Sequence, residues 1–158
     1  MSQDTTIYTA KPEILTVPEI LGLLDPRGLH AEWRPTYPSQ PDVPNGVFNV
    51  TGGSGEPSQI QISSQNVPDY ERDGILRTFG GALSDEKRQA IVETKTSYTV
   101  SRSWSRDPVR DYWSDHMISL LAAATAGLIY DHQDDRFYSV SEFRAKHAST
   151  VGSDPTVM

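Results

Sequence analysis

Cysteine is absent from this 158-residue chain. Its absence excludes disulfide bonds, thiolate nucleophiles and zinc sites built on sulfur, and it is typical of proteins from a reducing compartment. Long apolar runs are absent as well, since no stretch approaches the roughly 18 to 20 apolar residues that a membrane span needs. Residues 1–6 have neither the basic nor the apolar segment of a signal peptide. We therefore expect a soluble, cytoplasmic protein with no membrane association.

Basic residues are scarce, with 14 Lys and Arg against 21 Asp and Glu and a net charge of −7. This balance disfavours a nucleic-acid partner, because binding to the phosphate backbone needs a basic surface. Residues 36–71 contain no Lys or Arg at all, whereas they include Asp42, Glu56, Asp69 and Glu71. The region predicts an acidic surface suited to a protein partner with a basic surface, although acidic residues also simply keep a surface solvated.

Glycine and proline are both present in quantity, 11 of each, and the hydrophobic fraction is 36%. The many turn residues disfavour a helical bundle, while the length suits one hydrophobic core. We expect a single α+β domain over residues 13–147, with a flexible N-terminus at residues 1–12 and a flexible tail at residues 148–158.

Several helix starts are marked by capping residues. Thr16 and Glu19 form a capping box, and a second box is formed by Ser139 and Glu142. Ser84 precedes a third helix, which is expected to run to about Thr94. The longest helix is predicted to start at the Asp107-Pro108 pair and to end at Gly127. Its helically spaced stripe consists of Val109, Tyr112, Trp113, His116, Met117, Leu120, Leu121 and Ala124.

Strands are predicted around residues 30–34, 47–50, 59–63, 97–101, 128–130 and 137–139. Alternating apolar and polar residues mark 47–50, 59–63 and 97–101, and a short apolar run marks 128–130. The strand from residue 97, the long helix and the strand from residue 128 form a β-α-β unit over residues 97–131, whose strands we expect to be parallel or near neighbours. The predicted fold is α+β, with a mixed β-sheet of about five to six strands covered by three to four helices.

The densest set of metal-capable side chains is Asp131, His132, Asp134 and Asp135. Carboxylates and imidazole suit hard and borderline divalent ions. However, the set lacks the spacing of a calcium loop, and a turn between two apolar strands requires polar residues in any case. We interpret it as a hairpin turn and expect no metal and no cofactor.

A catalytic interpretation depends on residues that are distant in sequence. Asp115 and His116 are adjacent on a helix, so their side chains point about 100° apart and do not face each other. An enzyme or ligand-binding domain would instead need a pocket near His116, where His30, Asp115 and Asp131 converge with it. Because His116 lies on the apolar stripe, we interpret it as a core residue.

Two further segments suggest anion binding at first sight. Residues 51–56 superficially resemble a phosphate loop, but they lack the Gly-Lys-[Ser/Thr] ending and include Glu56, so we interpret them as a hairpin tip. A basic cluster precedes the long helix and could hold an anion at the helix N-terminus. Asp107 and Asp111 argue against that interpretation. The cluster consists of Arg102, Trp104, Arg106 and Arg110.

A protein interface is the more promising kind of site. The proline-rich loop after Trp33 carries exposed aromatic candidates beside acidic residues, and aromatic side chains are efficient anchors at interfaces. The residues that we expect to bind a partner are Tyr37, Asp42, Glu56, Asp69, Tyr70, Glu71, Asp73, Asp131, Asp134 and Asp135.

Residues 120–139, Leu-Leu-Ala-Ala-Ala-Thr-Ala-Gly-Leu-Ile-Tyr-Asp-His-Gln-Asp-Asp-Arg-Phe-Tyr-Ser, resemble the closing segment of small bacterial cytoplasmic α+β proteins, among them immunity proteins encoded beside polymorphic toxins. The shared pattern is structural, helix-strand-turn-strand, and carries no functional residues. The resemblance implies a non-catalytic inhibitor whose acidic surface covers the basic active site of a toxin. A structural or adaptor protein and a small enzyme or ligand-binding domain are the alternatives.

Overall fold

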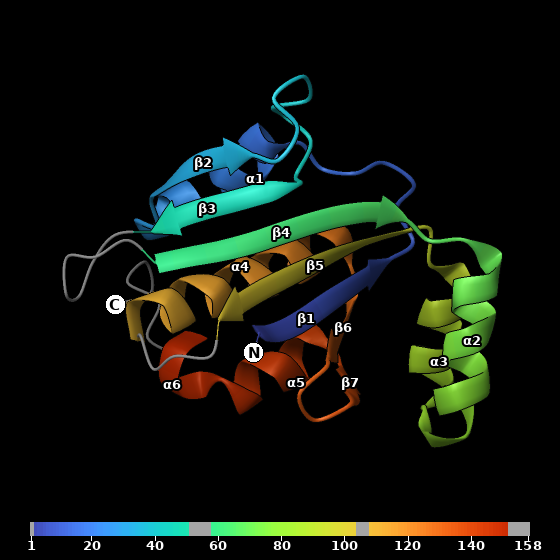
Figure 1. Cartoon of the computed structure of the whole chain (residues 1–158). Coiled ribbons are helices and arrows are strands. Elements are labelled where there is room, and N and C mark those ends of the chain that lie inside the picture. The colour runs from blue at the N-terminus through green and yellow to red at the C-terminus, as the bar shows by residue number, and fades with distance from the viewer. Residues whose placement is uncertain (1, 51–57, 104–107, 152–158) are drawn as a thin grey trace.

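The computed structural model describes residues 2–50, 58–103 and 108–151. One seven-stranded sheet has the order β2-β3-β4-β5-β1-β6-β7 (Figure 1). The strands are β1 (Ser2–Thr9), β2 (Ala31–Pro35), β3 (Gly46–Val50), β4 (Ser58–Asn66), β5 (Thr96–Ser103), β6 (Leu128–Asp131) and β7 (Arg136–Tyr138). The helices are α1 (Val17–Leu24), α2 (Asp69–Phe79), α3 (Asp85–Glu93), α4 (Pro108–Thr125), α5 (Val140–Lys146) and α6 (Ala148–Val151), with short 3₁₀ turns η1 (Asp25–Arg27) and η2 (Gly80–Ala82).

The α+β prediction is confirmed, and two details of the sheet differ from expectation. The sheet has seven strands instead of five to six, and every pair of neighbouring strands is antiparallel, so the sheet is not mixed. The reason is the position of β1, which pairs with β5 on one side and with β6 on the other. Because β5 and β6 are both antiparallel to β1, they point the same way and are near neighbours, but they do not pair with each other.

Residues 1–12 were expected to be flexible, whereas residues 2–9 form the strand β1 inside the sheet. Five of the eight residues of this strand are serine, glutamine or threonine, and only Ile7 and Tyr8 are large apolar or aromatic residues. Its buried Thr6 and Thr9 side chains are nevertheless satisfied, since Thr9 Oγ1 donates to the Thr125 carbonyl at 2.8 Å and Thr6 Oγ1 lies 3.0 Å from Thr99 Oγ1. Hydrogen bonding therefore makes a polar strand acceptable in the interior.

The capping predictions are confirmed where they can be compared. Thr16 caps α1 and Ser139 caps α5, each through a complete capping box, and Ser84 caps α3. Asp107 and the residues 51–56 lie outside the described residues. The long helix ends with Ala126 in the left-handed conformation (φ 52°), followed by Gly127. A Cβ at Gly127 would lie 2.7 Å from Cγ2 of Ile7, so glycine allows β6 to start close to β1.

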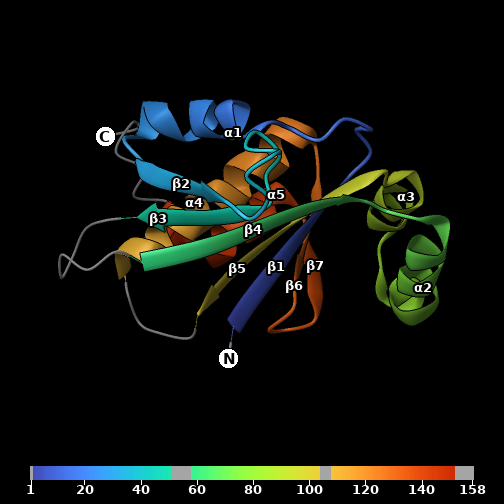
Figure 2. The same ribbon diagram turned by 45° about the horizontal axis from the view of Figure 1, so that its top comes forward.

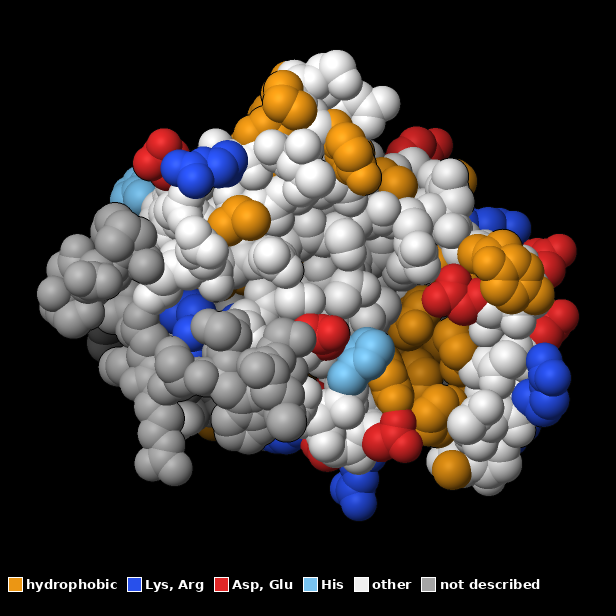
Figure 3. Space-filling view, in the orientation of Figure 1, with side chains coloured by type: hydrophobic (Ala, Val, Ile, Leu, Met, Phe, Trp, Pro, Cys, Tyr) orange, Lys and Arg blue, Asp and Glu red, His pale blue; other side chains and the backbone are white. Residues whose placement is uncertain are grey.

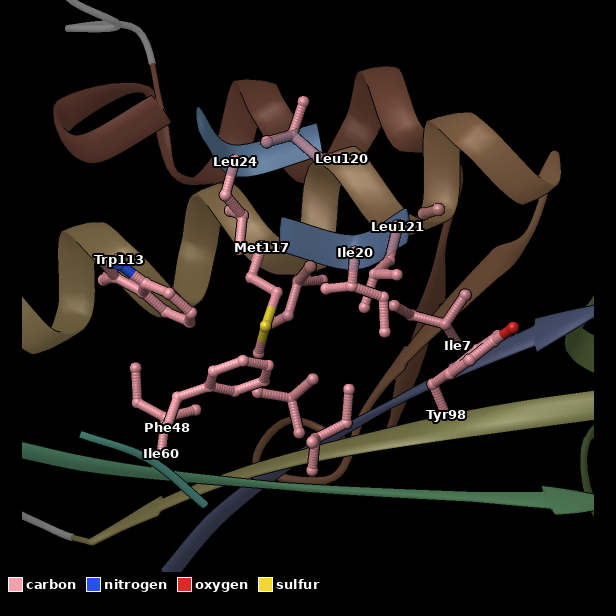
Figure 4. Close-up of a cluster of buried hydrophobic side chains, with 14 of the residues drawn as sticks. Ile7, Ile20, Leu24, Phe48, Ile60, Tyr98, Trp113, Met117, Leu120 and Leu121 are labelled. Carbon is pink, nitrogen blue, oxygen red and sulfur yellow. The ribbon is translucent and has the colours of Figure 1, made fainter. Parts of the chain in front are cut away.

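The main core lies between one face of the sheet and helices α1 and α4 (Figure 2). Phe48 of β3 is fully buried and contacts Trp33 and Trp113, with ring centroids 4.6 and 5.1 Å apart. Met117 and Leu121 of α4 project from the helix into the same cluster (Figure 4). Trp113, Met117 and Leu121 of the stripe predicted for this helix thus face the sheet, whereas Ala124 of that stripe is exposed.

Leu120→Ala is expected to lower the free energy of unfolding by about 2 to 3 kcal/mol, because Leu120 is 7% exposed and its removal opens a cavity at the edge of the core. Urea unfolding followed by circular dichroism measures the change. A loss below about 1 kcal/mol would contradict this role in the core.

A second, smaller core lies on the opposite face of the sheet, at one end. Its buried residues are Tyr8, Val67, Ile91, Leu128 and Phe137, and the partly buried residues that pack on them come largely from α2 and α3. These two helices stand at the end of the sheet instead of lying across it, as Figure 1 shows. The rest of this face is left without a helix among the described residues, and we call it the open face.

Candidate functional site

The centre of the open face is polar. Thr6 of β1 lies between Thr99 of β5 and His132, with Oγ1 3.0 Å from Thr99 Oγ1 and 2.8 Å from Nε2 of His132. The backbone N–H of His132 donates to the carbonyl of Asp4 at 3.2 Å. Oδ1 of Asp4 is buried and has no hydrogen-bond partner among the described residues. The open face therefore has hydroxyl, imidazole and carboxylate groups close together on β1, on β5 and in the turn that follows β6.

Towards β3 the open face is hollowed by a cavity of about 420 Å³. Tyr37, one of the predicted partner-binding residues, lies at its rim and is 57% exposed. The side chains that line the cavity from the sheet are hydroxyl and amide groups, with Gln61, Ser63 and Ser101 among them. This end of the face offers hydrogen bonds but no charge.

Towards α2 the open face becomes aromatic. Tyr8, Phe79, Tyr130 and Phe137 form one cluster, in which Tyr130 and Phe137 have ring centroids 4.7 Å apart, and Phe79 lies 5.6 and 5.3 Å from them. Tyr8 lies 6.2 Å from Phe137. Phe79 and Tyr130 remain half-exposed. Figure 3 shows the result as a hydrophobic depression between the sheet and α2, which we call the aromatic hollow.

The rim of the aromatic hollow is acidic. The carboxylate of Glu71 accepts only from the Gln65 amide, at 3.4 and 3.5 Å, and the carboxylate of Asp135 accepts from the hydroxyl of Tyr130. Neither carboxylate forms an ion pair within the described residues. Burial, and then the charge of Glu71, raise the pKa of Tyr8 to about 12. Burial also raises the pKa of Tyr130, and Asp135 raises it further. The hollow thus combines apolar rings with uncompensated negative charge.

Three other residues that were expected to bind a partner, Asp69, Tyr70 and Asp73, lie on α2. The sequence analysis did not predict this helix. Asp69 pairs with Arg72, Tyr70 is 78% exposed, and Asp73 is exposed. Asp73 follows Glu71 by two residues, so its side chain points about 200° away around the helix. Of the acidic residues on α2, Glu71 is therefore the one that borders the aromatic hollow.

The remaining predicted residues lie elsewhere. Asp131 and Asp134 share Lys146 of α5 as a partner, Asp131 at 2.9 Å, so part of their charge is compensated. Asp42 is in the loop between β2 and β3, where its carbonyl accepts from the N–H of Val17 at the start of α1. Glu56 lies outside the described residues. The ten predicted residues thus do not form one acidic patch, and Glu71 and Asp135 are the two at the aromatic hollow.

The residues of the enzyme alternative are not brought together. His30 is exposed and pairs with Asp25 at 3.5 Å, whereas His116 is 1% exposed and stacks on Tyr112 with centroids 4.4 Å apart. Asp115 is held between α4, β5 and α6 by Arg102, His147 and Thr150. Burial alone would raise the pKa of Asp115, but these three partners lower it below its ordinary value. Asp115 and Arg102 therefore act as a buried ion pair that supports the fold.

Sequence reasoning missed the aromatic half of the site. Tyr8, Phe79, Tyr130 and Phe137 come from four elements, and nothing local marks them as neighbours. One signal was present, since Tyr130 and His132 alternate with Asp131 and so point to the other face of the sheet from it. Within the described residues no group of three or more His, Cys, Asp or Glu side chains is arranged to hold a metal ion. None of the described helices combines the length and apolar character that crossing a bilayer requires.

Comparison with known proteins adds no relative. No known protein family, no curated protein and no solved structure matches the chain. The interpretation of the site therefore depends on its geometry and chemistry alone.

Proposed function

We propose that this protein is a non-catalytic binding protein that docks a basic protein partner on its open face, beside α2. Inhibition of a cationic toxin or enzyme, as by an immunity protein, is the role that suits such a surface. The observation that carries the proposal is the aromatic hollow, whose rim carboxylates Glu71 and Asp135 have no cationic partner in the described part of the chain.

The chemistry of the hollow supports this role in two ways. Half-exposed aromatic rings supply contact area at low cost in side-chain entropy, which is why they are frequent anchors of interfaces. Carboxylates that lack a counter-charge favour a partner of opposite sign and speed its encounter. The net charge of −7 acts in the same direction over longer distances.

The positions of the titratable side chains also favour binding over catalysis. Of the titratable side chains that an enzyme alternative would use, His116 is in the core, Asp115 and Asp131 are in ion pairs, and His30 is exposed and apart from them. Glu71 and Asp135 at the rim of the hollow form no ion pair within the described residues. A surface of this kind blocks or anchors a partner by complementarity and needs no reacting group.

Charge reversal at Glu71 is the test of the proposed function. Tagged protein is used to capture its partner from the native host, including the product of the neighbouring gene, at low and moderate salt. Glu71→Lys is expected to weaken binding of the captured basic partner at least tenfold, equal to about 1.4 kcal/mol, because it places a like charge at the contact. Isothermal titration calorimetry with the purified partner measures the change.

Asp73→Lys is the matched control, since it makes the same charge change on the same helix but on the side away from the hollow. It is expected to change affinity less than about threefold, through long-range charge alone. Equal effects of the two reversals, or an affinity that does not depend on salt, would reject the open face beside α2 as the docking surface.

A further inference from the structure

The aromatic hollow distinguishes between the kinds of side chain that an interacting protein can place in it. An apolar side chain would bury its own surface, but it would also remove water from Glu71 and Asp135 without replacing the lost solvation. A cationic side chain supplies positive charge to an acidic rim and is attracted by aromatic rings. The partly buried Tyr130 and Phe79 rings meet edge to face, with centroids 5.6 Å apart, and are the aromatic groups of the hollow that retain some exposure.

The chain does not supply this cation from its own described residues. Lys87 is held by Glu142 at 3.0 Å and by the carbonyl of Phe137 at 3.0 Å. Arg72 is held by Asp69 and by the carbonyl of Thr94. Arg72 of α2 and Lys87 of α3 reach the second core, but each is already bound to other groups. Burial is the main cause of the raised pKa values of Tyr8 and Tyr130, and Glu71 and Asp135 respectively raise them further.

The shape of the surroundings favours a flat cation. Arginine presents a planar guanidinium that stacks on aromatic rings and donates several hydrogen bonds to carboxylates, and it is less strongly hydrated than an ammonium group. Lysine presents a compact, strongly hydrated charge without a face to stack. Rings combined with carboxylates at one opening therefore match arginine better than lysine.

We propose that the aromatic hollow seats one arginine side chain of the partner, stacked on the exposed rings with its charge facing Glu71 and Asp135. This inference depends on the proposed function, because it names the anchor by which a basic partner is held. It assigns different roles to the two parts of the site, since the rings provide the stacking surface and the carboxylates select the charge.

The test uses a probe that does not depend on the partner. Nα-acetyl-arginine amide is titrated into the isotope-labelled full chain, and the aromatic ring signals are followed by NMR spectroscopy. The signals of Tyr130 and Phe79 are expected to shift saturably, with a dissociation constant on the order of 1 to 10 mM for so small a ligand. Nα-acetyl-citrulline amide has nearly the same shape without the charge, and it is expected to bind at least tenfold more weakly.

Two isosteric variants test the carboxylates. Glu71→Gln and Asp135→Asn are each expected to weaken the arginine probe at least threefold, and the asparagine keeps the left-handed backbone conformation of residue 135 (φ 59°). Asp73→Asn is the matched control and is expected to leave the affinity unchanged. An unchanged midpoint of thermal unfolding establishes that each variant is folded.

Three results would overturn the inference. Equal binding of the citrulline probe would show that charge is not recognised. Equal or tighter binding of Nα-acetyl-lysine amide would remove the assignment to arginine. Loss of partner binding in Glu71→Lys, combined with no ring shift by the arginine probe, would retain the docking surface and reject the anchor. Conversely, arginine binding without any basic partner would support the anchor and reject the proposed function.

Discussion

Phe48→Ala is expected to destabilise the protein by about 3 to 5 kcal/mol, among the largest effects of any single substitution. Phe48 is completely buried, and its ring lies between Trp33 of β2 and Trp113 of α4, so that it links the edge of the sheet to the main helix. Truncation removes both aromatic contacts and leaves a cavity that three rigid elements cannot close. Urea unfolding, with fluorescence from the neighbouring tryptophans as the signal, measures the loss.

Val47→Ala is the control for this prediction. Val47 precedes Phe48 on β3, but it faces the open side of the sheet and borders the cavity near Tyr37. Its truncation is expected to cost less than about 1 kcal/mol. Similar losses for the two variants would show that β3 does not bury Phe48 as described. Because Phe48 is on the opposite face from the aromatic hollow, the folded fraction of Phe48→Ala is expected to bind the arginine probe normally.

Arg102→Leu is expected to cost about 3 to 5 kcal/mol at pH 7, because it removes from a buried carboxylate the arginine that pairs with it beside His147. Arg102 of β5 lies 3.3 Å from the carboxylate of Asp115, 3.5 Å from that of Asp111, and its Nε donates to Gln3 at 2.8 Å. Asp115 is itself 4% exposed as a side chain, so water cannot replace the arginine. Chemical unfolding at pH 7 measures the loss.

The pH dependence of the free energy of unfolding tests whether the charge of Asp115 stabilises the fold. The pKa of Asp115 is lower in the folded protein than its ordinary value of 3.8. Its ion pairs therefore stabilise the fold above about pH 4, and this stabilisation is lost as the pH falls through the lowered pKa. In Arg102→Leu the buried charge is removed by protonation at low pH, so the difference from the parent protein is expected to shrink between pH 7 and pH 3.

The double variant Arg102→Leu/Asp115→Asn provides the control. If the two groups act as a pair, the double variant is expected to be more stable than the sum of the single losses predicts, by at least about 1 kcal/mol. Strict additivity, together with a stability difference that does not change with pH, would show that Arg102 contributes through packing and not through charge.

Elements with local signals were predicted well. The capping boxes at Thr16 and Ser139 need only residues three positions apart, and the structure contains both. The buried face of α4 follows from its helical spacing, since Met117 and Leu121 are in the core. In these cases the hydrogen bonds and apolar contacts that fix the element are formed by near neighbours in the chain.

Elements without local signals were not predicted. In β1, polar residues predominate, and they are satisfied by groups as distant as Thr125 and His132. The helix α2 has no side-chain cap and no fully buried residue. It is stabilised by contacts such as that of Phe79 with Phe137, which lies 58 residues further along the chain. Such partners exist only after the sheet has been assembled.

The sequence by itself determined the class of fold, the helix boundaries at capping residues and the acidic character of the chain, because composition and short-range hydrogen bonding decide these properties. Only the tertiary structure decided which of the described carboxylates have a cationic partner. Lys146 pairs with both Asp131 and Asp134, whereas Glu71 and Asp135, beside the rings of Tyr8 and Tyr130, have no counter-charge among the described residues. The physical reason is that the insertion of β1 between β5 and β6 sets which side chains share a face, and electrostatic compensation depends on distance in space and not on distance along the chain.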